Sequence, residues 1–219
     1  MTWVLENLGY IGALTLEHLV QCVPAIVFSF VLALPLGWLA NRYRPTRGLI
    51  LTAGGLLYAI PSFPLFIVLP LIIGVEVRSP INLIVALTIF GVALMLRVVA
   101  DGLASVDADV RQSAAAVGFS GWSAFWRVEL PLAGPVLLAG LRVVAVSTVS
   151  LATVGAIIGV QNLGSLFTDG FQRSIQSEII AGIVITVVIA LVLDGLLVAA
   201  GRVLMPWSHA VTRRADANA

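Results

Sequence analysis

Residues 178–204 read EIIAGIVITVVIALVLDGLLVAAGRVL, and between Ile179 and Gly201 this stretch contains a single charged residue, Asp194. A helix needs about 20 predominantly apolar residues to cross the hydrocarbon core of a bilayer. Four other stretches meet this requirement, namely 19–40, 48–74, 81–100 and 132–160. The sequence therefore predicts an all-α integral membrane protein with about five transmembrane helices, in one domain that covers residues 1–219.

The overall composition supports this prediction. Hydrophobic residues make up 60% of the 219 residues and charged residues 11%, whereas a soluble domain has about 25% charged and roughly 45–50% apolar residues. Such an excess of apolar side chains cannot be buried in one core surrounded by water. Lipid must solvate part of it.

All twelve cationic residues are arginine, and the net charge is +1. A Walker A phosphate loop needs a lysine to reach the β- and γ-phosphates of ATP, so this chain cannot bind ATP in that way, and any energy from ATP must come from a partner. A net charge so close to zero also argues against a nucleic-acid partner.

Cys22 is the only cysteine, which excludes an intrachain disulfide and a thiolate metal cluster. His18 lies four residues before it, on the same helix face, but two ligands do not complete a tetrahedral site. The expectation is an interfacial histidine, a packed cysteine and no metal.

The distribution of arginine predicts the orientation. Cytoplasmic loops collect arginine because positive charge resists translocation. If the N-terminus is outside and the C-terminus inside, most arginines of the connectors lie on the cytoplasmic side. The arginines that then lie in the cytoplasm are Arg42, Arg44, Arg47, Arg111, Arg127, Arg202, Arg213 and Arg214, against Arg78 and Arg173 outside.

Three prolines, Pro61, Pro64 and Pro70, interrupt the second span. Each removes a backbone donor and disfavours a straight helix, and broken backbone at membrane depth is tolerated only where protein or a water-lined cavity covers it. Two interpretations stay open. Residues 58–63 line a pathway, or the prolines form a kink that serves packing alone.

Two charged residues, Arg142 and Asp194, are expected inside the spans. Each lies roughly 15–16 Å from the cytoplasmic end of its helix at 1.5 Å per residue. Because intramembrane charges usually pair or face a cavity, we expect these two to neutralise each other. The alternative is that Arg142 extends toward a crevice.

The long polar loop, residues 101–131, reads DGLASVDADVRQSAAAVGFSGWSAFWRVELP. Asp107 is a suitable N-cap for a short helix that Gly118 ends, and Ser120 can cap a second turn. Pro131 is expected to close this turn before the fourth span. The second turn carries three aromatic residues, Trp122, Phe125 and Trp126, which indicate either a contact surface or anchoring at the membrane interface.

The loop resembles the EAA loop of binding-protein-dependent ABC importer permeases, whose pattern is E-A-A, three residues, G, nine residues and I-x-L-P. Gln112-Ser113-Ala114, Gly118 and Val128-Glu129-Leu130-Pro131 stand at these spacings, with Gln112 in place of Glu and Ser113 in place of the first Ala. Further stretches resemble the glycine betaine, choline and carnitine branch, and they are Leu16 to Leu19, Leu34 to Gly37, Ile60 to Ser62, Val106-Asp107, Ala139 to Arg142 and Ala156 to Gly164.

This resemblance implies a MetI-like permease in a bacterial plasma (inner) membrane. It implies two permease copies or two related permeases, two cytoplasmic ATPases that carry ATP and Mg, an external substrate-binding protein, and no cofactor or enzymatic activity in this chain. The loop would form coupling helices on the ATPase, with the aromatics packed on the ATPase or against the membrane. The coupling residues are then Asp107, Gln112, Ser113, Ala114, Gly118, Trp122, Phe125, Trp126 and Arg127. The pathway residues are then Tyr58, Pro61, Ser62, Phe63, Ser150 and Thr153, each with ordinary packing as the alternative.

Other functions stay open beside an osmoprotectant importer. The chain could serve an ABC importer for amino acids or another small solute. A membrane enzyme is suggested only by Asp101-Gly102, which lacks the arginine and later carboxylates of lipid-headgroup transferases. A stand-alone channel or secondary transporter often shows internal repeats, and none is visible here.

Overall fold

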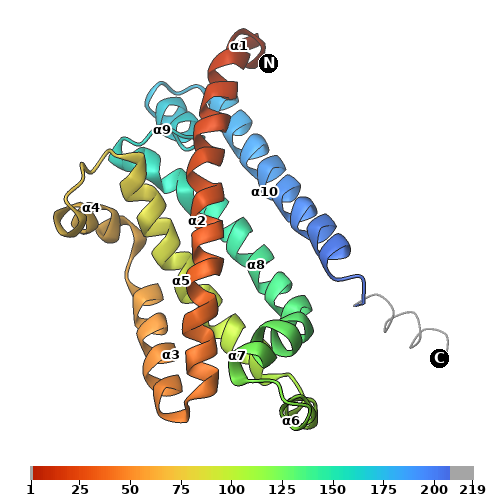
Figure 1. Ribbon diagram of the computed structural model, residues 1–219. Coiled ribbons are helices and arrows are strands. Elements are labelled where there is room, and N and C mark those ends of the chain that lie inside the picture. The colour runs from red at the N-terminus through yellow and green to blue at the C-terminus, as the bar shows by residue number, and fades with distance from the viewer. Residues whose placement is uncertain (1, 208–219) are drawn as a thin grey trace.

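The computed structural model describes residues 2–207, and these residues form helices and no strands. Arg213 and Arg214 lie outside the described residues. In Figure 1, the short helices α1 and α9 lie at one end of the molecule and α6 and α7 at the other. The helices are α1 (Thr2–Glu6), α2 (Leu8–Arg42), α3 (Arg44–Ala59), α4 (Ser62–Ile73), α5 (Pro80–Ala104), α6 (Ala108–Ala116), α7 (Gly121–Ala124), α8 (Leu130–Ala152), α9 (Ser165–Gln172) and α10 (Gln176–Leu204).

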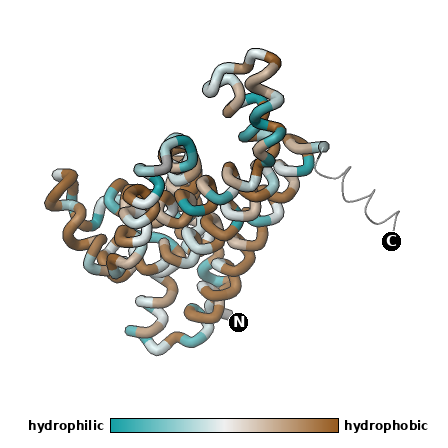
Figure 2. Tube along the Cα trace, turned by 90° about the horizontal axis from the view of Figure 1, so that it is seen from below, coloured by the Kyte–Doolittle hydropathy of each residue, from teal (hydrophilic) through white to brown (hydrophobic). Residues whose placement is uncertain are grey.

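Four helical stretches are long and apolar enough to cross a membrane. They are α2, α5, the stretch Gly121–Ile158 that contains α8, and α10, and the bent pair α3 and α4 can supply a fifth span. The apolar character of these long helices is visible along the chain trace in Figure 2. The prediction of about five apolar spans is therefore confirmed, although α2 begins at Leu8 and not at residue 19.

The second predicted span is two helices that meet at a bend of 107°. Ile60 has an extended backbone, with φ −64° and ψ 125°, as expected for a residue that precedes a proline. Pro61 is the N-cap of α4, and Pro64 lies in its first turn, where no backbone donor is needed. The prolines thus turn the chain sharply, and α4 leaves the direction of α3 (Figure 1).

The polar loop is shorter than predicted, and its boundary at Pro131 was wrong. Helix α5 continues to Ala104, and α7, a π-helical segment (Phe125–Glu129) and α8 form one continuous helical stretch. The N–H of Leu130 donates to the carbonyl of Phe125, five residues earlier. This wider turn accommodates the Pro131 ring, which would otherwise press on the carbonyl four residues before it.

The core is centred on the contact between α2 and α5. An added Cβ at Gly37 would overlap the side chain of Val99, and one at Gly91 would overlap the hydroxyl of Ser29. This hydroxyl lies 2.6 Å from the carbonyl oxygen of Ala25 and 3.2 Å from that of Thr88. Small residues therefore let the two backbones approach closely, as is common between membrane helices.

Helix α8 joins the same core and packs on both α2 and α5. Gly140 lies against Val98, so that α8 also approaches α5 closely. Helix α10 packs on α8 through Gly201, which faces Leu138. Much of the remaining surface of α10 is exposed and apolar, as expected for a helix that contacts lipid.

We expect Gly91→Ala to destabilise the protein by about 1–3 kcal/mol, because the added methyl group overpacks the α2–α5 contact. Gly12→Ala is the control, since an added Cβ there meets nothing within 4 Å. Thermal unfolding in detergent should show a lower midpoint for Gly91→Ala and an unchanged or higher midpoint for Gly12→Ala, because Ala is the better helix former. Equal midpoints for both variants would contradict the importance of this contact.

Candidate functional site

Helix α6 is the centre of the candidate site, and its two ends form as the sequence predicts. The carboxylate of Asp107 accepts a hydrogen bond from the N–H of Asp109 at 2.9 Å. At the other end, Gly118 has φ +91°, and the N–H of Phe119 donates to the carbonyl of Ala114 at 3.1 Å. Glycine adopts this left-handed backbone without steric cost, so Gly118 ends α6 and turns the chain toward α7.

The side chains of α6 divide into an exposed and a packed face. Gln112 and Ser113 are exposed, whereas Ala114 is buried. Helix α6 lies at the end of the molecule, beside α7 (Figure 1). The exposed face is therefore open to a partner that approaches from this end.

The three aromatic residues of the loop pack with a fourth one, Trp38, that comes from α2. Trp38 lies 5.8 Å from Trp122 and 5.9 Å from Phe125, measured between ring centroids. Phe125 is buried, and Trp122 and Trp126 are 59% and 47% exposed. Phe125 therefore belongs to the core, which leaves the two tryptophans as the surface of this cluster.

A polar cavity of about 380 Å³ lies between the end of α2, α6 and the start of the α7–α8 stretch. Arg42, Arg111, Gln112 and Glu129 are among its lining residues. Gln112, which stands where the EAA pattern has Glu, thus shares this cavity with two arginines and a carboxylate. Arg127 is exposed on the same end of the molecule.

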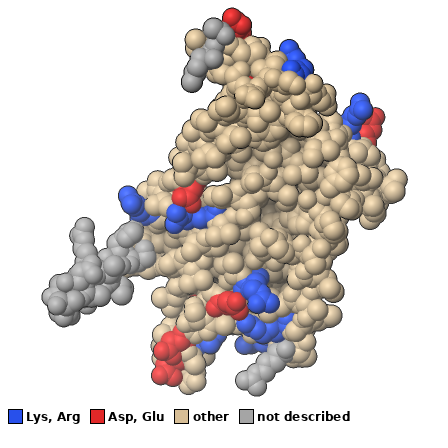
Figure 3. Space-filling model, turned by 180° about the vertical axis from the view of Figure 1, so that it is seen from behind, with Lys and Arg blue, Asp and Glu red and all other residues tan. Residues whose placement is uncertain are grey.

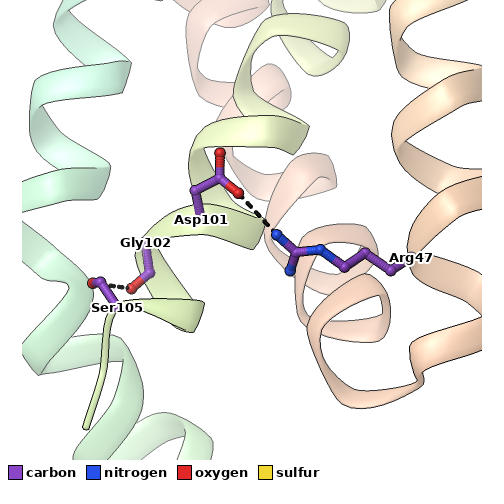
Figure 4. Close-up of polar contacts among 4 residues, drawn as sticks. All are labelled: Arg47, Asp101, Gly102 and Ser105. Carbon is purple, nitrogen blue, oxygen red and sulfur yellow. Dashed lines mark hydrogen bonds and ion pairs between the residues drawn. The ribbon is translucent and has the colours of Figure 1, made fainter.

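Asp101, at the start of the predicted loop, is held by an ion pair. Its carboxylate accepts a hydrogen bond from Arg47 of α3 at 2.9 Å (Figure 4). The carbonyl of Gly102 accepts one from the Ser105 hydroxyl at 2.7 Å, and Gly102 itself is buried against Val136 and Leu137. An ion pair and helix packing thus account for the Asp-Gly pair.

Arg142 and Asp194 meet inside the spans. Nε and one terminal nitrogen of Arg142 donate to the two carboxylate oxygens of Asp194, at 2.6 Å and 2.7 Å. The side chains are 41% and 25% exposed. This paired geometry satisfies both charges and joins α8 to α10. The face of the molecule in Figure 3 carries few charged side chains between its ends.

The predicted pathway residues fall into two groups. Tyr58, Pro61, Ser62 and Phe63 surround the bend between α3 and α4, and Tyr58 lines a cavity between α3 and α5. Ser150 and Thr153 lie at the end of α8, where the Thr153 hydroxyl donates to the Ser150 carbonyl at 2.7 Å. Thr153 lines a different cavity, with residues of α9 and α10.

A buried polar network ties α2 to the segment after α8. The amide of Asn162 donates to Gln21 at 3.2 Å and to the carbonyl of Ala152 at 2.9 Å. His18 is fully buried, with Nε2 3.1 Å from the carbonyl oxygen of Val149, so its predicted interfacial position was wrong. Cys22 is packed in the core, as expected.

Sequence reasoning did not single out Arg97, a charged residue within a predicted span. Arg97 lies on α5, inside the predicted span 81–100, and its side chain lines the same cavity as Tyr58. The sequence feature that could have identified it is an arginine inside an apolar stretch. Among residues 2–207 no group of three or more His, Cys, Asp or Glu side chains is placed to hold a metal ion.

Comparison with known proteins shows which protein family this chain matches. The model of one family, described as "Binding-protein-dependent transport system inner membrane component", matches residues 29–206. The osmoprotectant import permease protein OsmW of Salmonella typhimurium is 30% identical over 198 residues, which cover 89% of this chain and 92% of that protein. The glycine betaine/carnitine/choline transport system permease protein OpuCB of Bacillus subtilis is 28% identical over 206 residues, 94% of each chain.

Two solved structures share the fold. An inward-facing conformation of the MetNI methionine ABC transporter gives a TM-score of 0.74 at 21% identity, with 90% of this chain and 94% of that chain covered. The structure of an amino acid ABC transporter with histidines also gives 0.74, at 16% identity, with 92% and 97% covered. At these identities the likeness concerns the fold alone.

We expect Asp194→Asn to lower the thermal midpoint more than the double variant Arg142→Gln/Asp194→Asn. The single variant leaves Arg142 charged without its partner inside the span, whereas the double variant removes both charges. The measurement is unfolding in detergent, together with the amount of protein inserted in membranes. A double variant less stable than the single one would show that the charges do not depend on each other.

Proposed function

The chain belongs to the family of binding-protein-dependent transport system inner membrane components, and from this premise we propose that it imports osmoprotectants with α6 docked on an ATPase. As a member of this family it is a permease subunit of an ABC importer in the bacterial inner membrane. A separate partner hydrolyses ATP, and a substrate-binding protein delivers the solute. The single observation that carries the proposal is the exposed, capped helix α6 at the spacing of the EAA loop.

The proposed substrates are small quaternary ammonium solutes such as glycine betaine, carnitine and choline. The curated relatives that match along most of this chain are permeases whose names contain these solutes or the word osmoprotectant. The MetNI structure and the amino acid transporter share only the fold with this chain, so methionine and other amino acids are comparison substrates in the test below.

Helix α6 is the proposed docking element. Gln112 and Ser113 are exposed, while Asp107 and Gly118 fix the two ends of the helix. Trp122 and Trp126 extend this surface, and Phe125 anchors it to Trp38 of α2. Movement of α6 is thereby transmitted to α2 and, through the continuous stretch Gly121–Ile158, to the span of α8.

The orientation follows from the same assignment. With α6 on the ATPase, the end of the molecule that carries α6 and α7 faces the cytoplasm, and the end with α1 and α9 faces outward. Arg42, Arg47, Arg111 and Arg127 then lie at the cytoplasmic end, as the excess of arginine in cytoplasmic loops requires. The N-terminus is outside, and the substrate-binding protein approaches the end with α9.

Two permeases form the proposed pathway, as two copies of this chain or this chain with a related one. The bend between α3 and α4, with Tyr58, Pro61, Ser62 and Phe63, lies on the exposed surface of a single chain. Broken backbone at membrane depth requires cover by protein or a water-filled cavity. A second permease supplies that cover, and the pathway runs between the two.

The test of this function is uptake by the assembled importer. The chain is expressed with an ATPase and a binding protein from the same source and reconstituted in proteoliposomes. We expect ATP-dependent uptake of labelled glycine betaine, carnitine or choline, and none of methionine or histidine. Uptake without the ATPase, or uptake of the amino acids alone, would contradict the proposal.

A substitution at Gly118 tests the docking role of α6. Gly118→Val places a β-branched residue at φ +91°, which costs on the order of 1–3 kcal/mol and distorts the end of α6. We expect this variant to insert in the membrane normally and to lose most of the ATPase that co-purifies with the wild type. Gly48→Val is the matched control, because an added Cβ meets nothing within 4 Å at either glycine and Gly48 lies within α3. Equal co-purification by both variants would contradict the docking role.

A further inference from the structure

Helix α5 carries an arginine inside the membrane span. Arg97 lies seven residues before the end of the helix at Ala104, which places it about 10 Å along the axis from that end. Its side chain is exposed on the single chain, and charged residues within spans face the bundle interior or a water-filled cavity. The position of Arg97 therefore calls for a partner or a cavity.

No carboxylate in the described part of the chain pairs with Arg97. The acidic residue one turn further along α5 is Asp101, and it is held by Arg47 at 2.9 Å (Figure 4). Asp194, a carboxylate within α10, is held by two donor nitrogens of Arg142. Arg97 thus keeps its donors available for an anion that is not part of this chain.

A cavity of about 150 Å³ between α3 and α5 adjoins Arg97. Its walls include Leu51, Gly55 and Tyr58 from α3, and Leu96 from α5. A cavity of this size holds a molecule as large as benzene. At Gly55 an added Cβ would meet nothing within 4 Å, so the wall of the cavity is open there.

One aromatic ring, that of Tyr58, lines this cavity. Tyr58 packs edge to face on Phe90, with centroids 6.5 Å apart and the planes at 85°, and Tyr58 remains 54% exposed. Phe90 and Arg97 are seven residues apart on one face of α5, about 10 Å along the axis. The faces of aromatic rings attract quaternary ammonium groups, and a guanidinium binds a carboxylate with two parallel hydrogen bonds.

We propose that this cavity contacts zwitterionic solutes during transport, with Arg97 on the carboxylate and Tyr58 near the quaternary ammonium group. Arg97 thereby favours the passage of carboxylate-bearing osmoprotectants over choline, which has a hydroxyl in place of the carboxylate. This inference rests on the proposed function. Arg97 then selects among solutes within the permease, in addition to the selection by the binding protein.

The experiment compares solutes in the reconstituted importer at saturating binding protein. Arg97→Gln should lower the ratio of glycine betaine uptake to choline uptake roughly tenfold or more, the size expected for a lost hydrogen bond to a charged group. Carnitine should follow glycine betaine. Arg97→Lys should give a ratio between those of Arg97→Gln and the wild type, because lysine keeps the positive charge but cannot form the bidentate hydrogen bonds of arginine.

Two control variants separate this role from others. Arg202→Gln removes an exposed arginine from the last turn of α10 and should leave the ratio unchanged. Tyr58→Leu should slow all three solutes, since each has the quaternary ammonium group.

Several results would overturn the inference while leaving the proposed function intact. These are an unchanged ratio in Arg97→Gln, an equal loss of all three solutes, and failure of this variant to assemble with the ATPase, which would give Arg97 a structural role. A wild-type importer that moves none of the three solutes would instead overturn the proposed function itself.

Discussion

Helices α2 and α5 are in close contact because small residues face each other where they pack. Gly91 admits the hydroxyl of Ser29, and Gly37 admits Val99. Apolar side chains gain little from leaving lipid for one another, so helix association in a membrane depends on close packing and on hydrogen bonds between helices. The positions of α3 and α8, which both pack on α5, follow from this contact. The ends of α2 and α5 in turn position Trp38 and the connection to α6.

The sharp bend at Ile60–Pro61 has a consequence for the surface of the molecule. Because α4 turns away by 107°, the end of α3 remains uncovered, and Tyr58 stays exposed beside α5. A straight second span would cover α5 along more of its length. Arg97 lies beside the part of α3 that precedes the bend, where Leu51 and Gly55 line the same cavity.

Local patterns in the sequence predicted local features well. Asp107 as a cap and Gly118 as a helix end depend on backbone geometry within a few residues, which residue type largely determines. The pairing of Arg142 with Asp194 could also be anticipated, because two opposite charges at similar depth have few other ways to be satisfied. The packing of Trp38 on Trp122 and Phe125 could not be read from the sequence, since it joins residues more than eighty positions apart.

The sequence by itself determined that this chain crosses a membrane, about how many times, and where its polar helix begins and ends. These properties follow from the length of apolar stretches and from capping residues, which act locally. Only the tertiary structure decided that Pro131 lies within a continuous helix, that His18 is buried, and that Asp101 pairs with Arg47 and leaves Arg97 without a carboxylate partner among residues 2–207. The burial of His18 and the pairing of Asp101 depend on which helices meet and at what height, which is set by packing between residues distant in the chain, whereas the path through Pro131 depends on the π-helical turn before it.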